Sequence, residues 1–165
     1  MRIWVMRHGE AGFNAKTDNQ RTLTENGQKM AFKQGQWLAK RLSDQQLSFD
    51  KILVSPYQRT QQTLEQVLAG IQAVGFVQSF ANLTRCVETW DGITPAGDVD
   101  NVLSYLDFLR SEGTKNVLII SHLPLVFDLT QALTASQHSV HFYPAVIAEI
   151  DWQTNHGKLL VTEFP

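Results

Sequence analysis

Short apolar runs alternate with amphipathic stripes along most of this 165-residue chain. The apolar runs predict strands, and the stripes, in which apolar residues recur every three or four positions, predict helices between them. Strands that alternate with helices require a largely parallel sheet with helices on both faces, and the last two runs are close enough to form an antiparallel hairpin. The predicted strands are Arg2–Met6, Lys51–Val54, Asn116–Ser121, Ala145–Trp152 and, after the turn Gln153–Gly157, Lys158–Glu163.

Helical stripes fill the intervals between these strands. Thr24 is a predicted N-cap of the first helix and Asp98 of the third, because short polar side chains accept hydrogen bonds from the first turn. No repeat, linker or low-complexity tract interrupts the chain, so residues 1–165 are predicted to form a single α/β domain, a three-layer sandwich. The stripes are Ala31, Gly35, Leu38 and Leu42; Leu64, Val67, Leu68 and Ile71; Val99, Val102, Leu103, Leu106 and Leu109; and Val126, Leu129 and Leu133.

Composition excludes several classes of protein. A net charge of −2 gives no general attraction to nucleic acid or to an anionic membrane, so any anion site must be local. The single Cys86 excludes an intramolecular disulfide and a cysteine zinc cage. We find neither a signal peptide nor an apolar run long enough to span a bilayer, and therefore expect a cytoplasmic protein without nucleic-acid or membrane partners.

Three of the predicted strands end in junctions that carry histidine or arginine. Parallel strands place such junctions at the same edge of a sheet, where open α/β folds bind their ligands. We therefore expect Arg7, His8, Arg59 and His122 to converge on one site. The junctions are Arg7-His8-Gly9-Glu10, Ser55-Pro56-Tyr57-Gln58-Arg59-Thr60 and Ser121-His122-Leu123-Pro124.

Such a site is suited to a phosphoryl dianion. Guanidinium groups bind phosphate oxygens bidentately, and a nearby helix N-terminus adds backbone donors. A histidine among them can act as a nucleophile toward phosphorus. The chain contains no P-loop pattern, and His138 and His141 lack the spacing and carboxylate partners of a metal site, so we expect no metal and no cofactor.

The chain closely resembles the histidine phosphatase superfamily, and within it the small bacterial phosphohistidine phosphatases of the SixA type. The resemblance runs nearly from end to end and implies a phosphoglycerate-mutase-like fold. Five motifs carry it: Arg7-His8-Gly9-Glu10; Leu23-Thr24-Glu25-Asn26-Gly27; Ser55-Pro56-Tyr57-Gln58-Arg59-Thr60-Gln61-Gln62-Thr63; Thr94-Pro95-Ala96-Gly97-Asp98; and Ser121-His122-Leu123-Pro124-Leu125-Val126.

The resemblance implies roles for individual residues. It implies that His8 is the nucleophile that is phosphorylated and that the phosphoryl group is bound by Arg7, Arg59 and His122. Two carboxylates, Asp91 and Glu88, compete for the role of general acid, and Asp91 is favoured because Trp90-Asp91-Gly92 resembles the family's acidic residue followed by glycine. The further candidates for substrate binding are Gly9, Asp18, Arg21, Ser55 and Glu88.

The resemblance also implies a substrate. Family members that act on small metabolites insert helical segments over the site, whereas here the connections between Asn14 and Leu23 and between Ala73 and Asp98 are short. An open site suits a phosphorylated side chain on another protein. The expected activity is therefore hydrolysis of phosphohistidine on a histidine-phosphotransfer domain of a sensor kinase, which releases inorganic phosphate. The alternatives are a general phosphomonoesterase or mutase of the same fold, and a non-hydrolytic histidine phosphocarrier.

Overall fold

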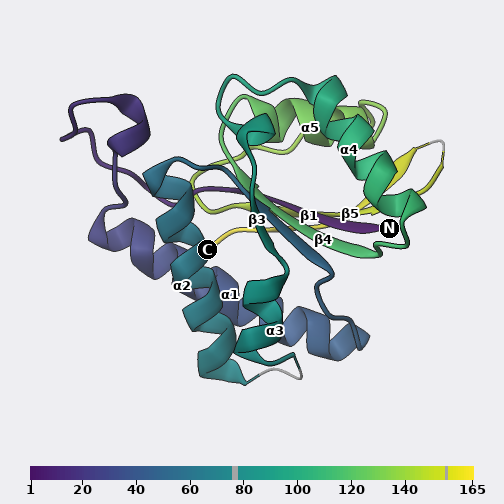
Figure 1. Ribbon diagram of the computed structural model, residues 1–165, viewed down its shortest axis with the longest axis horizontal. Helices are drawn as coiled ribbons and strands as arrows, with labels where there is room; N and C mark the ends of the chain where they lie inside the picture. Colours follow the sequence, from purple (N-terminus) through teal and green to yellow (C-terminus); the bar gives the residue numbers. More distant parts are fainter. Residues whose placement is uncertain (76–77, 155) are drawn as a thin grey trace.

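The computed structural model describes residues 1–75, 78–154 and 156–165. Within them, six strands form one sheet in the order β3-β2-β4-β1-β5-β6, and helices cover both of its faces (Figure 1). This arrangement confirms the predicted α/β three-layer architecture. The strands are β1 (Arg2–Arg7), β2 (Lys51–Val54), β3 (Val87–Thr89), β4 (Asn116–Ser121), β5 (Ile147–Trp152) and β6 (Gly157–Glu163); the helices are α1 (Glu25–Gln45), α2 (Gln58–Val74), α3 (Phe80–Arg85), α4 (Val99–Ser111) and α5 (Leu125–Leu133).

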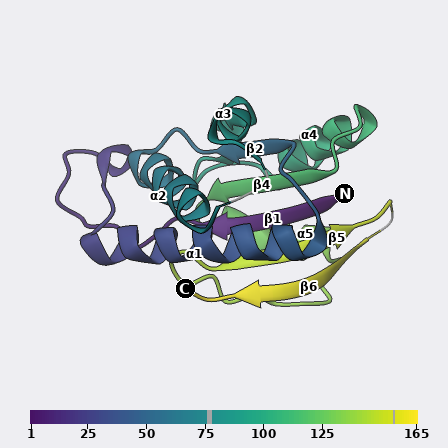
Figure 2. The same cartoon turned by 90° about the horizontal axis from the view of Figure 1, so that it is seen from below.

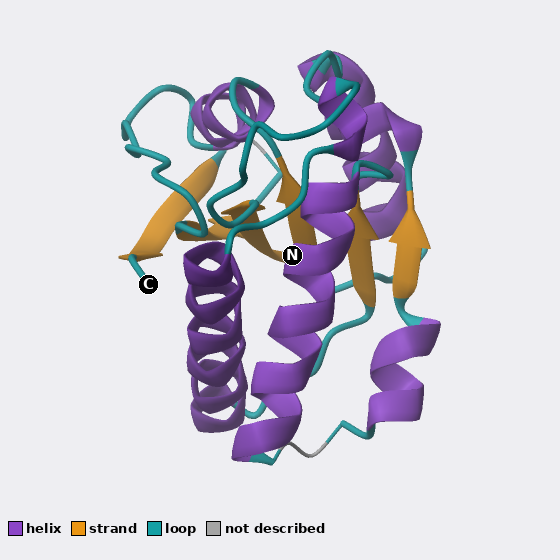
Figure 3. Ribbon diagram, turned by 90° about the vertical axis from the view of Figure 1, so that its left-hand side faces the viewer, coloured by secondary structure: helices purple, strands orange, loops and turns teal. Residues whose placement is uncertain are grey.

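The direction of the strands determines where the functional side chains meet. Strand β4 pairs in parallel with β1 on one side and with β2 on the other, and β2 pairs in parallel with β3. These four strands therefore end at one edge of the sheet, the end of the molecule where long loops gather in Figure 3. Strands β5 and β6 form the predicted antiparallel hairpin, which continues the sheet beyond β1 (Figure 2).

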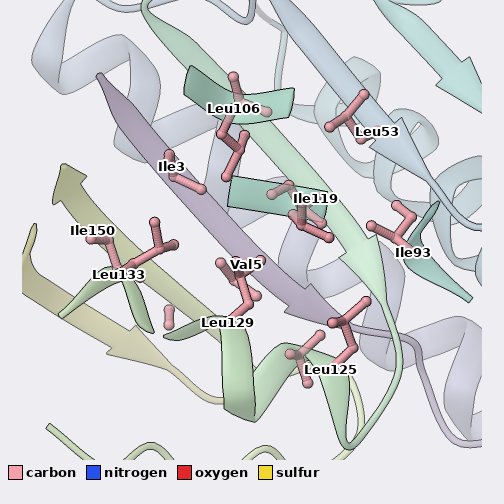
Figure 4. Packing of buried hydrophobic residues seen from close by; sticks show 14 of the residues in the cluster. Ile3, Val5, Leu53, Ile93, Leu106, Ile119, Leu125, Leu129, Leu133 and Ile150 are labelled. Carbon is pink, nitrogen blue, oxygen red and sulfur yellow. The ribbon is translucent and has the colours of Figure 1, made fainter. Parts of the chain in front are cut away.

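Alternation along β1 supplies both halves of the core. Ile3 and Val5 point toward α4 and α5, while Trp4 and Met6 point toward α1 and α2, and all four side chains are fully buried. Figure 4 shows the first of these clusters, in which leucines of α4 and α5 pack on the sheet. Both faces of β1 are covered by helices, so every side chain from Ile3 to Met6 is buried. The sequence therefore shows a continuous apolar run before Arg7.

The predicted N-caps are present. The Thr24 side chain accepts a hydrogen bond from the Gly27 N–H at the start of α1, and the Asp98 side chain accepts one from the Asp100 N–H at the start of α4. Each cap supplies an acceptor for backbone donors that the first helical turn leaves unpaired. No described helix combines the length and the apolar character of a membrane-spanning segment.

Three features differ from the sequence-based expectation. Strand β3 and helix α3 were not predicted, because three partly exposed residues and a six-residue helix are too short to show a period. Strand β5 begins at Ile147, two residues later than predicted, since Ala145 has a left-handed φ of 64° that an extended strand cannot contain. Asn155, in the predicted turn of the hairpin, lies outside the described residues.

Candidate active site

His8 lies directly after β1, and its backbone is fixed from two sides. Its N–H donates to the Ser121 carbonyl at the end of β4 at 3.0 Å, and its carbonyl accepts from the Ala145 N–H at 2.9 Å. The imidazole is almost entirely buried, with 7% of the residue exposed. The side chain that sequence analysis singled out as nucleophile is thus held at the carboxyl edge of the sheet.

Hydrogen bonds define the tautomer of His8. Nδ1 lies 2.7 Å from the Gly9 carbonyl oxygen, which can only accept, so Nδ1 carries the proton. The unprotonated Nε2 accepts from the Nε–H of Arg59 at 3.4 Å. Burial lowers the pKa of His8 to about 4, and the nearby guanidinium charges of Arg7 and Arg59 act in the same direction. At neutral pH the ring is therefore uncharged, with its Nε2 lone pair facing Arg59.

Gly9 is required by a close approach of two backbones. A Cβ atom at Gly9 would lie 2.6 Å from the Gly27 carbonyl oxygen, and one at Gly27 would lie 2.1 Å from the Glu10 carbonyl oxygen. The loop after His8 thus packs directly on the first turn of α1. This contact explains why glycine stands both in Arg7-His8-Gly9 and at the end of the Leu23–Gly27 motif.

Arg59 stands in the first turn of α2 and is 4% exposed. Besides its bond to His8, its Nη1 donates to the Asp18 backbone carbonyl at 2.7 Å and its Nη2 to the Asp18 carboxylate at 3.2 Å. A cation at a helix N-terminus is unfavourable, and the Asp18 carboxylate offsets that cost. Each terminal nitrogen keeps a second N–H, so the guanidinium is oriented and still able to bind a ligand.

His122 follows β4 and is 1% exposed. Its Nε2 lies 2.8 Å from the Ser55 hydroxyl, and its ring centroid lies 5.3 Å from that of His8. None of the described residues forms a hydrogen bond with its buried Nδ1. Burial is the largest cause that lowers the pKa of His122 to about 3, and His8 and Arg59 act in the same direction, so the ring of the free protein is neutral at pH 7.

Arg7 completes the cluster from the last position of β1. Its Nη1 donates to the Phe142 carbonyl at 2.9 Å, and none of the described groups pairs with its buried Nε. Burial lowers the pKa of Arg7, and the charges of Arg59 and Arg21 add to this effect, although a guanidinium remains charged at any physiological pH. The guanidinium groups of Arg7 and Arg59 therefore give the site a positive potential, next to the neutral imidazoles of His8 and His122.

The loop between β1 and α1 brings two of the other candidates to this site. Asp18 lies in the short 3-10 helix η1 (Asp18–Gln20), where its carboxylate accepts from both Arg59 and Arg21. Although burial opposes ionisation, these two hydrogen bonds lower the pKa of Asp18. Arg21 contacts Asp18 and other residues of this loop: its Nε donates to the Gly12 carbonyl, and its guanidinium lies 4.2 Å from the centre of the Phe13 ring.

The two competing carboxylates, both in the described part of the chain, form no hydrogen bond with the cluster. The Glu88 carboxylate, on β3, accepts from Lys51 at 2.9 Å and from the Tyr105 hydroxyl of α4. Although burial opposes ionisation, the bonds from Tyr105 and Lys51 lower the pKa of Glu88. Asp91 is exposed and begins the 3-10 helix η2 (Asp91–Ile93), which follows β3 at the carboxyl edge of the sheet. No hydrogen bond links either carboxylate to Arg7, His8, Arg59 or His122, all of which the structure describes.

Two residues of the Ser55–Thr63 motif that received no role from the sequence also support the site. The Thr63 hydroxyl accepts from the Gly9 N–H at 3.0 Å and donates to the Arg59 carbonyl at 2.7 Å. The Tyr57 ring lies 5.0 Å from both the His122 ring and the Arg59 guanidinium. Thr63 stands four positions after Arg59 in α2, and this helical spacing on one face is the signal that could have found it.

Comparison with known proteins agrees with this geometry. A sequence model of the histidine phosphatase superfamily (branch 1) matches residues 3–101. The chain belongs to this superfamily. It is 44% identical to the phosphohistidine phosphatase SixA homolog of Haemophilus influenzae, over 98% of this chain and 94% of that protein. It is 36% identical to the phosphohistidine phosphatase SixA of Escherichia coli K12, over 91% of this chain and 84% of that protein.

A solved structure extends the similarity to three dimensions. The protein histidine phosphatase SixA complexed with tungstate superposes with a TM-score of 0.81 and 33% identity, over 99% of this chain and 97% of that one. The family membership and the α/β fold expected from the motifs are therefore confirmed. In this fold, the Arg-His-Gly motif stands at the end of β1, and the second histidine, His122, follows β4.

Proposed function

We propose that this protein is a phosphohistidine phosphatase that removes the phosphoryl group from a histidine of a partner protein through a phospho-His8 intermediate. One observation carries the proposal. His8 is neutral, holds its proton on Nδ1 and presents the Nε2 lone pair beside the guanidinium of Arg59. An uncharged nucleophile surrounded by cations is the arrangement that phosphoryl transfer to nitrogen requires.

In the first step the Nε2 lone pair of His8 attacks phosphorus and forms a P–N bond. The P–N bond of the substrate breaks, and its electron pair stays on the leaving imidazole, which takes a proton from solvent. The His8 ring gains positive charge, which the Gly9 carbonyl stabilises through Nδ1–H at 2.7 Å. Arg7 and Arg59 stabilise the negative charge on the equatorial oxygens.

In the second step a water molecule attacks the phosphorus of phospho-His8. The P–N bond returns its electron pair to Nε2, the water loses a proton to solvent, and inorganic phosphate leaves. Asp18 keeps Arg59 in place throughout, because it binds the guanidinium through both its backbone and its carboxylate. When the Ser55 hydroxyl donates to Nε2 of His122, the proton of the ring stands on Nδ1, and this N–H binds a phosphoryl oxygen. The Tyr57 N–H donates to the Ser55 hydroxyl oxygen at 3.4 Å and so favours a hydroxyl whose proton points to His122.

The partner we propose is a histidine-phosphotransfer domain of a sensor kinase. Two observations support a protein substrate rather than a small metabolite. The relatives SixA of Escherichia coli and its homolog of Haemophilus influenzae are named phosphohistidine phosphatases. In addition, α3 directly precedes β3, a strand parallel to β2, so this helix lies at the edge of the sheet opposite the site and does not cover it. We propose that residues 1–165 act as one histidine-phosphatase domain.

The test is a single-turnover reaction with a histidine-phosphotransfer domain carrying 32P-phosphohistidine. We expect label to appear transiently on the enzyme as acid-labile, alkali-stable phosphate and then as free phosphate. His8→Ala should remove both signals. Stable labelled enzyme without free phosphate would indicate the phosphocarrier instead, and turnover of alkyl phosphates but not of phosphohistidine would indicate the phosphomonoesterase or mutase.

A further inference from the structure

A depression in the surface lies next to the active site. It has a volume of about 360 Å³ and is lined by five apolar or aromatic side chains, together with Arg7 and His141. We call it the flanking groove. Val140 and Phe142 form its buried floor, while Leu123 and Tyr143 are 39% and 63% exposed at its rim. Phe127, on α5, is the fifth member of the lining.

The flanking groove shares Arg7 with the active site. Arg7 belongs to both, since it lines the groove and its guanidinium charge acts on His8 and His122. The Arg7 Nη1 donates to the carbonyl of Phe142, a residue of the groove floor. Leu123 directly follows His122 in the chain. A substrate that places its phosphoryl group against Arg7 and His122 therefore brings its neighbouring atoms over the groove.

The lining selects the chemistry of the occupant. An apolar floor beside a charged site favours a molecule with a phosphoryl group at one end and an apolar group close by. A small sugar phosphate has no such apolar group. The volume of about 360 Å³ matches one or two large side chains and is too small for a whole helix, which favours side chains that project from a partner's surface.

We propose that the flanking groove binds a large apolar side chain of the substrate protein, one helical turn away from the phosphohistidine. This inference rests on the proposed function, and it names an apolar side chain as the feature of the substrate that the enzyme recognises besides the phosphoryl group. Residues three or four positions apart on a helix have Cβ atoms about 5–6 Å apart and share a face. A leucine, isoleucine, methionine or phenylalanine at that spacing reaches the groove while the phosphohistidine enters the site.

The experiment uses alanine-based helical peptides with a central phosphohistidine. A single leucine is moved through each position within about four residues of it, and release of free phosphate gives kcat/KM for each peptide. We expect leucine at a position three or four residues away to raise kcat/KM about tenfold over the all-alanine peptide, because it buries apolar area that alanine does not. Equal values for all peptides would overturn the inference.

The double variant Phe127→Ala/Tyr143→Ala tests whether the groove causes the preference. We expect the ratio of kcat/KM between the best leucine peptide and the all-alanine peptide to fall to about one. The ratio does not depend on the fraction of folded enzyme, since both peptides meet the same preparation. Phe108→Ala is the matched control, because Phe108 is an exposed aromatic residue of α4 outside the groove, and the ratio should be unchanged.

The remaining outcomes are distinct. A leucine preference that persists in the double variant would overturn the inference. If the wild-type enzyme hydrolyses neither the peptides nor the phosphorylated histidine-phosphotransfer domain, the proposed function itself fails and the inference fails with it. Hydrolysis of the domain but of none of the peptides would overturn the inference alone. Hydrolysis of all peptides at one rate leaves the proposed function standing and refutes only the groove.

Discussion

The Nε–H of Arg59 points at Nε2 of His8 across 3.4 Å, so a group proposed to bind the substrate contacts the lone pair proposed to attack it. The bond is long, and Arg59 is held independently by Asp18. When a phosphoryl group enters, the planar guanidinium must shift as a whole for this N–H to bond to a phosphoryl oxygen in place of the imidazole. The contact adds to the burial that keeps His8 neutral in the free enzyme, and it must break before the lone pair can attack.

The first prediction concerns the protonation of the two histidines. With a pKa of about 4 for His8 and about 3 for His122, both rings should stay neutral down to about pH 5. Nitrogen NMR of the labelled protein checks this, and we expect His8 to appear as the Nδ1–H tautomer. Titration of His8 near its ordinary value of about 6.5 would contradict the buried, neutral nucleophile.

The same pKa shifts make stability depend on pH. Between about pH 4 and pH 6.5 the unfolded chain binds protons at these two histidines that the folded protein does not. The free energy of unfolding should therefore rise with pH over this window, by up to about 1.4 kcal/mol per pH unit for each histidine. Urea unfolding at several pH values measures the slope, and His122→Gln should reduce it.

A second prediction concerns the orientation of Arg59. Arg59→Lys should lower kcat by about 30- to 1000-fold, because an ammonium group cannot bond to His8, Asp18 and the phosphoryl group in one plane. Asp18→Asn should cost less, about tenfold, since the backbone carbonyl of Asp18 still binds Nη1. Asp107→Asn, which removes a surface ion pair with Arg110, is the matched control and should be silent.

Convergence of the central cluster could be predicted from the sequence. β1, β2 and β4 are neighbours that run in parallel, so residues following each strand must meet at one edge. The prediction needed only the apolar runs and the histidine or arginine after each. It did not need the order of the strands.

The contacts of the two carboxylates could not be predicted in this way. Glu88 stands opposite Leu53 in the register of β3 and β2, and this register turns its side chain toward Lys51 and Tyr105. A three-residue strand has too little pattern to reveal which face each side chain occupies. The Arg7–Phe142 contact was equally hidden, because a backbone carbonyl in a loop has no sequence signature.

A third prediction is that activity does not depend on divalent metal. Arg7 and Arg59 supply the positive charge that a metal would otherwise bring to the equatorial oxygens. Overnight dialysis against EDTA should leave kcat unchanged, whereas tungstate, a tetrahedral oxyanion that a solved SixA binds, should inhibit in competition with substrate. Loss of activity on dialysis, with recovery on adding Mg²⁺ or Zn²⁺, would contradict the prediction.

A fourth prediction concerns the stability of the fold. Glu149 is fully buried on β5, where it accepts hydrogen bonds from the Trp4 indole and from Arg2 and Arg41. Glu149→Gln should lower the free energy of unfolding by about 3 kcal/mol, because it leaves cations without their buried partner. Although burial opposes ionisation, Arg41 and Trp4 lower the pKa of Glu149, so this contribution should be lost as pH falls below about 4.5. Acid unfolding curves of the variant and wild type check both points.

The last prediction concerns the general acid and follows from the leaving group. An alkyl ester must expel an alkoxide, so an acid that protonates the leaving oxygen should accelerate its hydrolysis by about 10²–10⁴-fold. Phosphohistidine expels an imidazole, which leaves as a neutral group once solvent has protonated its ring. We therefore expect Asp91→Asn to reduce turnover of an alkyl phosphate strongly and that of phosphohistidine by less than about threefold. Glu88→Gln is the matched control, because Lys51 and Tyr105 already hold that carboxylate on β3. Equal losses for the two substrates in Asp91→Asn would refute the argument, and a large loss only in Glu88→Gln would assign the acid to Glu88.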